Sequence, residues 1–255
     1  MFLKNQSKFM KLSVVIPAYN EAESLPETVN AIFEELVKNN IDHEIFVVND
    51  NSKDNTIEVL NMLKEKVNTL QWITNEGPNG FGYAVRKGLE NFTGDCVAIM
   101  MADLSDSPSD LVLFYNKISE GNYDAVFGTR WSKGGKVYDY PYIKKIINRV
   151  ANTIIKICFR IKYNDTTNAF KMYKRKTVEG IKPFLSPHFN LTIELPLKVI
   201  IRGFSYTVVP NSWRNRKHGV SKLKIREMGT RYFFILLYCL LEKYFSKNDF
   251  KKKWN

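Results

Sequence analysis

The sequence predicts an α/β protein with a mainly parallel central sheet, and three observations support this. Short apolar segments rich in β-branched residues alternate with amphipathic segments through the first half of the chain. This alternation is typical of parallel strands covered by helices on both faces. Polar residues follow directly after several of the apolar segments. The chain has 255 residues, of which 44% are hydrophobic and 25% charged, enough for one large core or two small ones.

The first strand is predicted at Leu12 to Ile16, a β-branched run that ends at Pro17. Ser24 lies three residues before Glu27, the spacing of a capping box, so we expect a helix from there to about Lys38. The same patterns predict strands at 44–48, 71–74, 96–101, 125–127 and 206–209, and helices at 54–66, 142–160, 191–202 and 222–245.

Polar side chains gather where the predicted strands end. In open α/β sheets, ligands bind beyond the carboxyl ends of the strands. The clustering therefore predicts a ligand site at this edge of the sheet. The residues concerned are Tyr19, Asn20 and Glu21 after the first strand, Asp50 after the second, Asp103, Ser105 and Asp106 after the fourth, and Thr129 and Arg130 after the fifth.

The formal net charge of +12 favours an anionic partner: a phosphorylated ligand, an anionic membrane or nucleic acid. Nucleic acid is excluded as a partner because the sequence contains no zinc pattern, helix-turn-helix signature or RNP motif. Three clusters of positive charge adjoin apolar residues, which distinguishes them from the scattered, solubilising lysines. They are Lys144, Lys145, Arg149, Lys156 and Arg160; Lys222, Lys224, Arg226 and Arg231; and Lys251, Lys252 and Lys253.

The last predicted helix has an apolar centre, Tyr232 to Leu241, flanked by basic residues and followed by Trp254. Ten helical residues span about 15 Å, half of a bilayer core of about 30 Å, so we expect no membrane crossing. The composition favours an amphipathic helix lying on a membrane surface. A core or dimerisation helix is the alternative.

Location is predicted from the cysteines and from the first residues. Met1 to Lys11 is too polar for a secretory signal. Cys96, Cys158 and Cys239 lie in apolar surroundings and form no C-x-x-C pair, so we expect three buried thiols in a reducing compartment. These features predict a cytoplasmic protein.

Several motifs, in order along residues 11 to 226, resemble those of family 2 glycosyltransferases. The last of them is similar to the R-x-x-G-x-S-K loop of the dolichol-phosphate mannose synthase group. The resemblance implies a glycosyltransferase A type nucleotide-binding sandwich, with a catalytic domain at 1–225 and a basic, apolar C-terminal helix and tail at 226–255. The motifs are Val14 to Glu21, Val47 to Thr56, Gly80 to Gly88, Ala102 to Ser105, Phe127 to Arg130, and Arg216 to Lys222.

The resemblance also implies a donor site for a GDP- or UDP-sugar. Asp50 is expected to hold the nucleoside, and its alternative role is a helix N-cap. Arg130 and Arg216 are expected to contact phosphates, because a guanidinium matches phosphate oxygens. The other implied donor residues are Pro17, Ala18, Tyr19, Glu21 and Lys222.

Asp103 is implied as the ligand of a divalent cation, Mg²⁺ or Mn²⁺, that neutralises the leaving nucleoside diphosphate. The family's first motif aspartate is replaced here by Met101, whose thioether is a poor ligand for a hard cation. The second ligand is therefore expected from Ser105 or Asp106, and we favour Asp106. The alternative is that Asp106 caps the helix that begins near Pro108.

The acceptor implied by the last motif is a polyprenyl phosphate. Such a phosphate is already anionic and needs cations and alignment rather than a strong base. Lys145, Arg149 and Ser221 are the acceptor candidates, and Glu194 is the spare general base if the acceptor is a hydroxyl. In the stretch that resembles D-x-x-S-G-F-R, Asn168, Ala169 and Lys171 replace the serine, glycine and arginine.

These features predict a metal-assisted, inverting transferase that moves a sugar from a nucleotide-sugar to a polyprenyl phosphate. Asp103 and Arg216 are its expected catalytic residues. It is expected at the cytoplasmic face of a membrane, held by its surface or by a membrane-anchoring partner protein. Two alternatives remain: a transferase that acts on a saccharide acceptor in surface polysaccharide synthesis, and a non-catalytic nucleotide-sugar binder, suggested by Met101.

Overall fold

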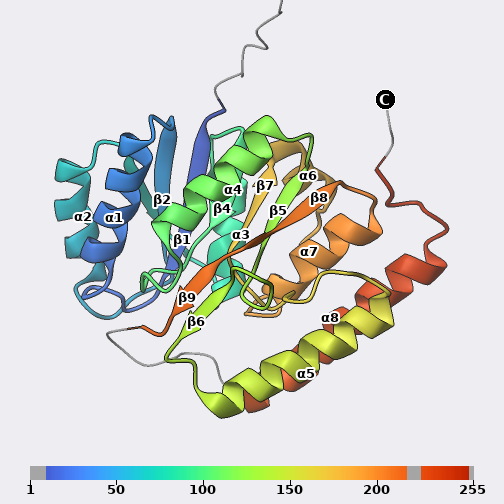
Figure 1. Ribbon diagram of the computed structural model, residues 1–255. Coiled ribbons are helices and arrows are strands. Elements are labelled where there is room, and N and C mark those ends of the chain that lie inside the picture. The colour runs from blue at the N-terminus through green and yellow to red at the C-terminus, as the bar shows by residue number, and fades with distance from the viewer. Residues whose placement is uncertain (1–9, 217–224, 253–255) are drawn as a thin grey trace, which may run out of the picture.

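The computed structural model describes residues 10–216 and 225–252. Its centre is a seven-stranded sheet in the order β3-β2-β1-β4-β7-β5-β8 (Figure 1). All neighbouring pairs are parallel except those of β7, which lies antiparallel between β4 and β5. The predicted, mainly parallel sheet is therefore confirmed. The strands are β1 Leu12–Ala18, β2 His43–Asn49, β3 Leu70–Thr74, β4 Cys96–Ile99, β5 Ala125–Thr129, β7 Lys171–Lys174 and β8 Tyr206–Pro210.

Helices cover both faces of this sheet, and each face has its own apolar core (Figure 1). Residues of α1, α2 and α4 pack in one core, and residues of α3, α5, α6, α7 and α8 pack in the other. The helices are α1 Leu25–Lys38, α2 Thr56–Lys66, α3 Phe81–Asn91, α4 Pro108–Glu120, α5 Tyr142–Phe159, α6 Arg175–Gly180, α7 Leu191–Ile201 and α8 Ile225–Phe245.

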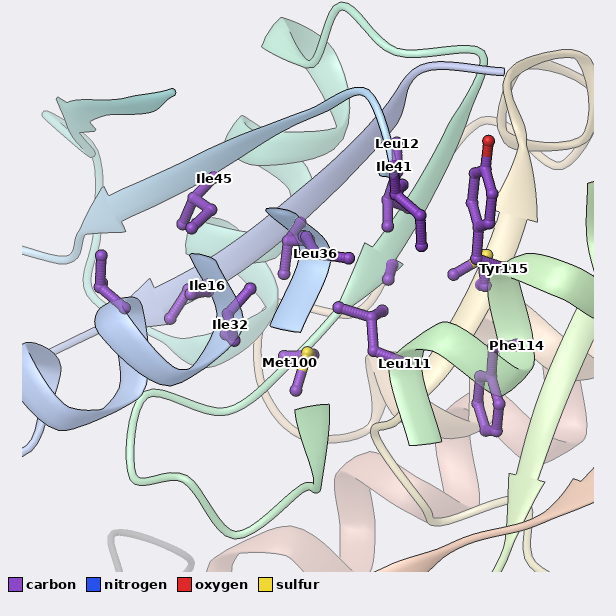
Figure 2. Close-up of a cluster of buried hydrophobic side chains, with 14 of the residues drawn as sticks. Leu12, Ile16, Ile32, Leu36, Ile41, Ile45, Met100, Leu111, Phe114 and Tyr115 are labelled. Carbon is purple, nitrogen blue, oxygen red and sulfur yellow. The ribbon is translucent and has the colours of Figure 1, made fainter. Parts of the chain in front are cut away.

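Strand β1 is buried on both faces, which explains its continuous apolar sequence. Leu12 and Ile16 point into the first core, where Ile32 and Leu36 of α1 pack (Figure 2). Val15, between them in sequence, belongs to the second core. The two-residue period of a strand accounts for this division.

Helix α3 lies so close to β1 that one position on it admits no side chain. A Cβ atom added to Gly88 would lie 2.4 Å from Cγ1 of Val15. Because packed interiors tolerate no such overlap, any larger residue there would push α3 off the sheet.

A short two-stranded ribbon lies beside the carboxyl ends of the main strands. It pairs β6, Lys136–Tyr138, with β9, Ser212–Arg214, in parallel. Backbone contacts fasten β9 to the loop after β4: Trp213 forms an antiparallel bridge with Asp106, and the N–H of Arg214 donates to the carbonyl of Ser105 at 3.0 Å. The ribbon therefore forms a wall at this edge of the sheet.

Helices α5 and α8 lie side by side at one end of the molecule (Figure 1). Each packs one face inward, with Ile155 and Phe159 of α5 and Ile235 and Cys239 of α8 buried. A buried bidentate ion pair joins Arg202, just after α7, to Glu242 of α8 at 2.7 and 2.9 Å.

The outward faces of these two helices carry large apolar side chains, which we call the α5/α8 apolar face. On α5 they are Ile143, Ile146, Ile147, Val150, Ile154 and Ile157, and on α8 they are Phe233, Phe234, Leu237, Leu241, Tyr244 and Phe245.

Within the described ranges, 10–216 and 225–252, no helix has the length and apolar character that a bilayer crossing requires.

Two local expectations differ from the structure. Helix α1 begins after Ser24 as predicted, but the capping box does not form, since the Ser24 hydroxyl donates instead to the Glu21 carboxylate at 2.8 Å. Cys96 and Cys239 are buried as expected, whereas Cys158 is exposed. Its neighbour Ile157 is also exposed, so an apolar sequence neighbour did not indicate burial on this helix.

Candidate active site at the carboxyl ends of the strands

The loops that follow β1, β2 and β4 each turn through a left-handed residue. Asn20 has φ 51°, Asn51 has φ 57° and Leu104 has φ 53°. Asparagine tolerates this region through local hydrogen bonds, but a leucine there is strained. Strain of this kind persists where the surroundings enforce it, often at functional sites. Leu104 directly follows Asp103, the residue expected to hold the metal.

The motif after β2 joins its loop to the loop after β1. The hydroxyl of Ser52 accepts the N–H of Asn20 at 2.9 Å, and Asp54 accepts the N–H of Ala22 at 3.2 Å. Asp54 also accepts from the N–H and hydroxyl of Thr56 at 3.1 and 2.5 Å. Burial alone would raise the pKa of Asp54, but these hydrogen bonds outweigh it and lower the pKa. Asp54 therefore supports this turn.

Asp50 lies directly after β2 and is 5% exposed. One carboxylate oxygen accepts from the amide of Asn75 at 2.7 Å, and the other accepts the N–H of Gly80 at 2.7 Å. The side chain thus holds the loop that precedes α3 against β2. It does not act as the N-cap of α2, a position that Asn55 occupies. The expected contact of Asp50 with a nucleoside remains a prediction.

Asp103 and Arg216, the two expected catalytic residues, are in direct contact. Nη2 of Arg216 lies 2.6 Å from Oδ2 of Asp103, and Nη1 lies 3.6 Å from Oε1 of Glu21. The side chains of Asp103 and Arg216 are 6% and 15% exposed. The structure therefore brings together residues 113 positions apart in sequence, from the β4 loop and from the segment after β9.

The surroundings of Asp103 show which side chain could bind a divalent cation together with it. Oδ1 of Asp103 accepts the N–H of Ser105 at 3.1 Å, and both residues line the same cavity. Hard cations take carboxylate and hydroxyl oxygens of this kind. Asp103 and Ser105 therefore fit Mg²⁺ or Mn²⁺. Among described residues, no cluster of three or more His, Cys, Asp or Glu side chains is suited to a metal.

Asp106, the favoured second ligand, is placed differently. It is 1% exposed, accepts the N–H of Met101 at 3.4 Å, and is not among the described residues that line the cavity. Burial, with a smaller contribution from Asp103, raises its pKa to about 7. The geometry favours Ser105 over Asp106. Asp106 does not cap α4 either, since Ser107 holds the N-cap position.

A cavity of about 340 Å³ lies between the first turn of α1, the loop after β4 and the β6–β9 ribbon. Asp103 and Ser105 form one side, and Tyr138 and Trp213 come from the ribbon. The ribbon residues could not be predicted from the sequence, because three-residue strands have no measurable period.

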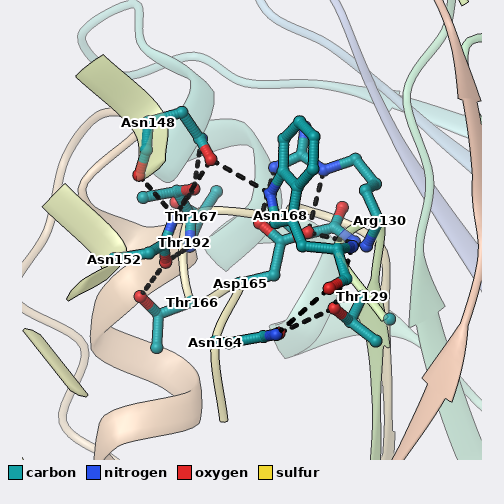
Figure 3. Close-up of polar contacts among 12 residues, drawn as sticks. Thr129, Arg130, Asn148, Asn152, Asn164, Asp165, Thr166, Thr167, Asn168 and Thr192 are labelled. Carbon is teal, nitrogen blue, oxygen red and sulfur yellow. Dashed lines mark hydrogen bonds and ion pairs between the residues drawn. The ribbon is translucent and has the colours of Figure 1, made fainter. Parts of the chain in front are cut away.

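The structure corrects the expectation for Arg130. Its guanidinium forms a buried bidentate pair with Asp165 at 2.9 and 2.7 Å, and its backbone N–H donates to the same carboxylate at 2.9 Å (Figure 3). Burial would lower the pKa of Arg130, but the Asp165 charge outweighs it and raises the pKa. Arg130 therefore joins the end of β5 to the 164–168 loop and is not presented to a donor phosphate.

Amide and hydroxyl side chains connect this loop to α5 (Figure 3). The amide of Asn148 donates to the hydroxyl of Thr167 at 2.7 Å, and the hydroxyl of Thr166 donates to Asn152 at 2.7 Å. The indole N–H of Trp131 donates to Asn148 at 3.2 Å. This network positions α5 relative to the site.

Three cations surround the half-buried ring of Trp131. The guanidinium of Arg149 lies 5.3 Å from its centroid, and Lys145 and Arg130 each lie 5.7 Å away. We call Trp131, Lys145 and Arg149 the Trp131 cluster. Contacts of this length are cation–π interactions. Trp131 was missed in the sequence, although it directly follows the Phe127 to Arg130 motif.

Lys171, which replaces the motif arginine, is 1% exposed. It donates to the backbone carbonyls of Thr166 at 3.1 Å, Thr192 at 3.2 Å and Asn168. Burial lowers its pKa to about 7. The lysine thus joins the 164–168 loop to α7, a structural contact.

The structure also corrects the expectation for Glu194. Its side chain is fully buried, pairs with Lys198 at 2.6 Å, and accepts the N–H groups of Leu185 and Ser186 at 2.8 and 2.7 Å. A carboxylate with these partners and no exposure cannot reach an acceptor hydroxyl. Glu194 was expected only as a spare general base, and Lys198, one turn later on α7, is its partner.

The remaining predicted site residues fall in two groups. Pro17 and Ala18 end β1, and Tyr19 follows them as a half-buried side chain. Ser221 and Lys222 lie outside the described residues, and their assigned roles remain predictions.

The profile described as Glycosyl transferase family 2 matches residues 13–181, which run from β1 through α6. The chain belongs to glycosyltransferase family 2. This range contains the loops after β1, β2 and β4 and the Trp131 cluster, but not Arg216 or β9.

Two curated relatives show which family members the chain resembles. It is 33% identical over 219 residues to the dolichol-phosphate mannosyltransferase of Pyrococcus furiosus, with 84% of this chain and 60% of that protein covered. It is 28% identical to the polyprenol monophosphomannose synthase of Mycolicibacterium smegmatis, with 86% of each covered. The chain thus spans less than two thirds of the length of the first relative.

A solved structure supports the fold. Glucosyl-3-phosphoglycerate synthase of Mycobacterium tuberculosis, in complex with Mn²⁺, UDP and phosphoglyceric acid, superposes with a TM-score of 0.68 at 18% identity, over 91% of this chain and 78% of that one. The expected glycosyltransferase A type sandwich is therefore confirmed.

Proposed function

We propose that this chain transfers a sugar from a nucleotide-sugar to a polyprenyl phosphate, with inversion at the anomeric carbon. One observation carries the proposal: the Trp131 cluster, with its cations, lies at the start of α5, the helix that also bears half of the α5/α8 apolar face. To bind the phosphate of a lipid, a protein needs cations at the edge of a surface that contacts the bilayer. The two polyprenyl-phosphate transferases named above are consistent with this acceptor.

The donor side of the proposal rests on the loops after β1 and β2. A nucleoside lies against Pro17, Ala18 and Tyr19, with Asp50 accepting from base or ribose groups. These residues meet at the strand ends, where open α/β sheets bind nucleotides. A GDP-sugar and a UDP-sugar fit this description equally, and the assay below distinguishes them.

Asp103 and Ser105 would hold Mg²⁺ or Mn²⁺, which supplies charge neutralisation for the leaving nucleoside diphosphate. Arg216, already in contact with Asp103, donates to the same phosphates. Its fork of donors stabilises the negative charge that develops as the bond breaks.

In the transfer itself, a phosphate oxygen of the acceptor attacks the anomeric carbon from the face opposite the diphosphate. The new carbon–oxygen bond forms as the bond to the donor's β-phosphate oxygen breaks, and the nucleoside diphosphate departs. Lys145 and Arg149 align the acceptor and screen repulsion between the two anions. No general base is needed, which agrees with the burial of Glu194.

We infer that the α5/α8 apolar face lies on the cytoplasmic surface of a membrane and makes this a peripheral protein. Ile143, Ile157, Phe233 and Phe245 are 71, 69, 69 and 76% exposed. Isolated exposed apolar residues are ordinary, but a contiguous row on two adjacent helices marks an interaction surface. Basic residues along α5 add attraction to anionic lipid.

The α5/α8 proposal is tested with liposomes containing anionic lipid. Ile143→Asp with Ile157→Asp should abolish co-sedimentation, whereas Met62→Asp, at a 56% exposed position on α2, should not. If the double variant co-sediments unchanged, the α5/α8 apolar face does not bind the membrane. A membrane-anchoring partner protein would then be the occupant of this face.

Transfer is tested by supplying labelled GDP- and UDP-sugars with Mg²⁺ or Mn²⁺ to the chain and a polyprenyl phosphate, then extracting into organic solvent. Label in the lipid phase should disappear with Asp103→Ala and fall strongly with Arg149→Ala. Donor binding or hydrolysis with no label in the lipid phase would refute the lipid acceptor. A saccharide acceptor, or a non-catalytic nucleotide-sugar binder, would then be the better description.

A further inference from the structure

Lys171, the first residue of β7, is a buried charged side chain to which the proposed function gives no role. Its amine donates to the carbonyls of Thr166, Asn168 and Thr192. Among the residues that the structure describes, no carboxylate forms an ion pair with it. Burial of an ammonium without a paired carboxylate is costly, and an apolar side chain would fill the same space. The three carbonyl contacts should therefore explain why a lysine is present.

One of these contacts is explained by a proline in α7. In an α-helix the carbonyl of one residue accepts the N–H of the residue four positions later, so the carbonyl of Thr192 would pair with residue 196. That residue is Pro196, which has no N–H. Lys171 donates to the Thr192 carbonyl at 3.2 Å and so replaces the missing donor. Because a buried carbonyl without a donor destabilises a fold, Lys171 and Pro196 complement each other.

The other two carbonyls belong to the 164–168 loop, which holds the proposed acceptor residues. A carbonyl of this loop accepts from the guanidinium of Arg149 at 3.4 Å. The threonine side chains of the loop bind two asparagines of α5 (Figure 3). One of them, Asn148, also accepts the indole N–H of Trp131 at 3.2 Å. The loop therefore supports both Trp131 and Arg149, and Lys171 supports the backbone of the loop.

We propose that Lys171 is a positioning residue for the acceptor: it fixes the 164–168 loop to α7, and through the loop it places Trp131 and Arg149. The inference rests on the proposed function. Lys171 touches no substrate in this arrangement and acts only through the loop. An ammonium has three donors, which here hold two loop carbonyls and one α7 carbonyl around a common centre. The loop cannot move relative to α7 without breaking a charge-assisted hydrogen bond.

Helix α7 is a suitable anchor for this loop because it is buried and packs against α8. The side chain of Thr192, whose carbonyl Lys171 binds, is hydrogen-bonded to Tyr232 of α8. Helix α8 bears the second half of the α5/α8 apolar face, which the proposed function places on the membrane. Lys171 therefore fixes the acceptor cations at a constant distance from that face. A lipid phosphate, whose depth is set by the bilayer, would then meet the cations at one level.

The donor residues are held by contacts that do not involve Lys171. Asp50 is bound by partners in the loop between β3 and α3. Asp103 contacts Arg216. None of these contacts includes the 164–168 loop. A change at Lys171 should therefore alter the use of the acceptor and leave the use of the donor unchanged.

The test measures the KM of each substrate for the full chain, with labelled nucleotide-sugar, polyprenyl phosphate and Mn²⁺. Lys171→Met keeps a side chain of similar length without its donors, and should raise the KM for polyprenyl phosphate about tenfold with the donor KM unchanged. Lys171→Arg supplies a charged donor group again, and a cavity of about 10 Å³ beside Lys171 leaves room for it. This variant should bring the acceptor KM back to within about twofold of the wild type.

A change in α7 separates positioning from stability. Pro196→Ala gives the Thr192 carbonyl a helical N–H again. In this background Lys171→Met should lower the urea midpoint of unfolding less than it does in the wild-type background. The acceptor KM should still rise about tenfold, because the loop carbonyls lose their donor in both backgrounds. Pro196→Ala alone is the matched control and should show both wild-type KM values.

Each outcome has a definite meaning. Equal increases in both KM values for Lys171→Met would overturn the positioning role and leave the proposed function standing. The same conclusion follows if Pro196→Ala restores the acceptor KM together with stability, or if Lys171→Arg folds but does not restore it. If Lys171→Met does not fold, the double variant with Pro196→Ala decides. A wild-type chain that transfers no sugar to polyprenyl phosphate would refute the proposed function, and the inference with it.

Discussion

Replacing Arg216 with glutamine should strengthen metal binding while it weakens sugar transfer. In the structure the guanidinium of Arg216 occupies one oxygen of Asp103 at 2.6 Å. A divalent cation that binds Asp103 must therefore compete with that contact. Arg216→Gln removes the competing charge but keeps a side chain of similar length.

The size of the effect follows from the ion pair. Both side chains are largely buried, at 6% and 15% exposure, so solvent screens the contact only partly. A hydrogen bond to a charged group contributes about 1.5–3 kcal/mol, which corresponds to a change in affinity of about ten- to a hundredfold. The dissociation constant for Mn²⁺ alone, without nucleotide, should fall by this factor.

The assay is a titration of the chain with Mn²⁺, in which electron paramagnetic resonance measures the free ion. Arg214→Gln is the control, because it removes one positive charge from the same segment while the Arg214 guanidinium lies over the Tyr138 ring at 5.0 Å. Equal increases in both variants would show a general charge effect and refute the competition. Weaker Mn²⁺ binding by Arg216→Gln would refute it as well.

Three further predictions concern stability and acceptor use. Glu194→Gln should destabilise the fold by about 3–5 kcal/mol in urea unfolding, because it leaves the charge of fully buried Lys198 without its partner; a change below 1 kcal/mol would contradict this. Burial would raise the pKa of Asp124, but the ion pairs with two lysines, Lys252 at 2.8 Å among them, outweigh it and lower the pKa. Because the folded pKa is depressed, Asp124→Asn should lower the free energy of unfolding by about 1–3 kcal/mol at pH values above the unfolded pKa of about 3.9. In thermal unfolding, this loss should shrink as the pH falls below that value; a difference independent of pH would count against the ion pairs. Trp131→Ala should raise the KM for polyprenyl phosphate about tenfold, by loss of the aromatic face that orients Lys145 and Arg149, with the donor KM unchanged; equal changes in both would indicate a general loss of structure.

Much of the fold could be predicted from the chain because its main strands are buried runs with clear ends. The strands predicted at Leu12 to Ile16 and at 44–48 were found within two residues, although β1 continues through Pro17 to Ala18, and their carboxyl ends indicated the candidate site. Strand β7 was missed, since Lys171 to Lys174 begins and ends with lysine and reads as polar. Its antiparallel pairing depends on partners that are far away in sequence.

Site residues were predictable where a single motif supplies them, and their contacts were unpredictable where segments distant in sequence meet. Asp103 and Arg216 were identified separately, and the structure places them in contact. Arg130 and Glu194 had the right chemistry for a site, but each has a buried partner, Asp165 and Lys198. A motif shows what a side chain can do and not which neighbour it already binds.

The contact between β9 and the β4 loop also has a consequence for the order of synthesis. When residues 1–205 have left the ribosome, the chain contains the loops after β1 and β2 and Asp103, but neither Trp213 nor Arg216. Strand β8, the outer partner of β5, is also missing at that point. The loops after β1, β2 and β4 are therefore available before β9 and Arg216, which complete the candidate site. Under the proposed function, a truncated product that ends before β9 lacks Arg216 and is expected to be inert in transfer, which would protect a cell from a half-made enzyme that consumes activated sugar.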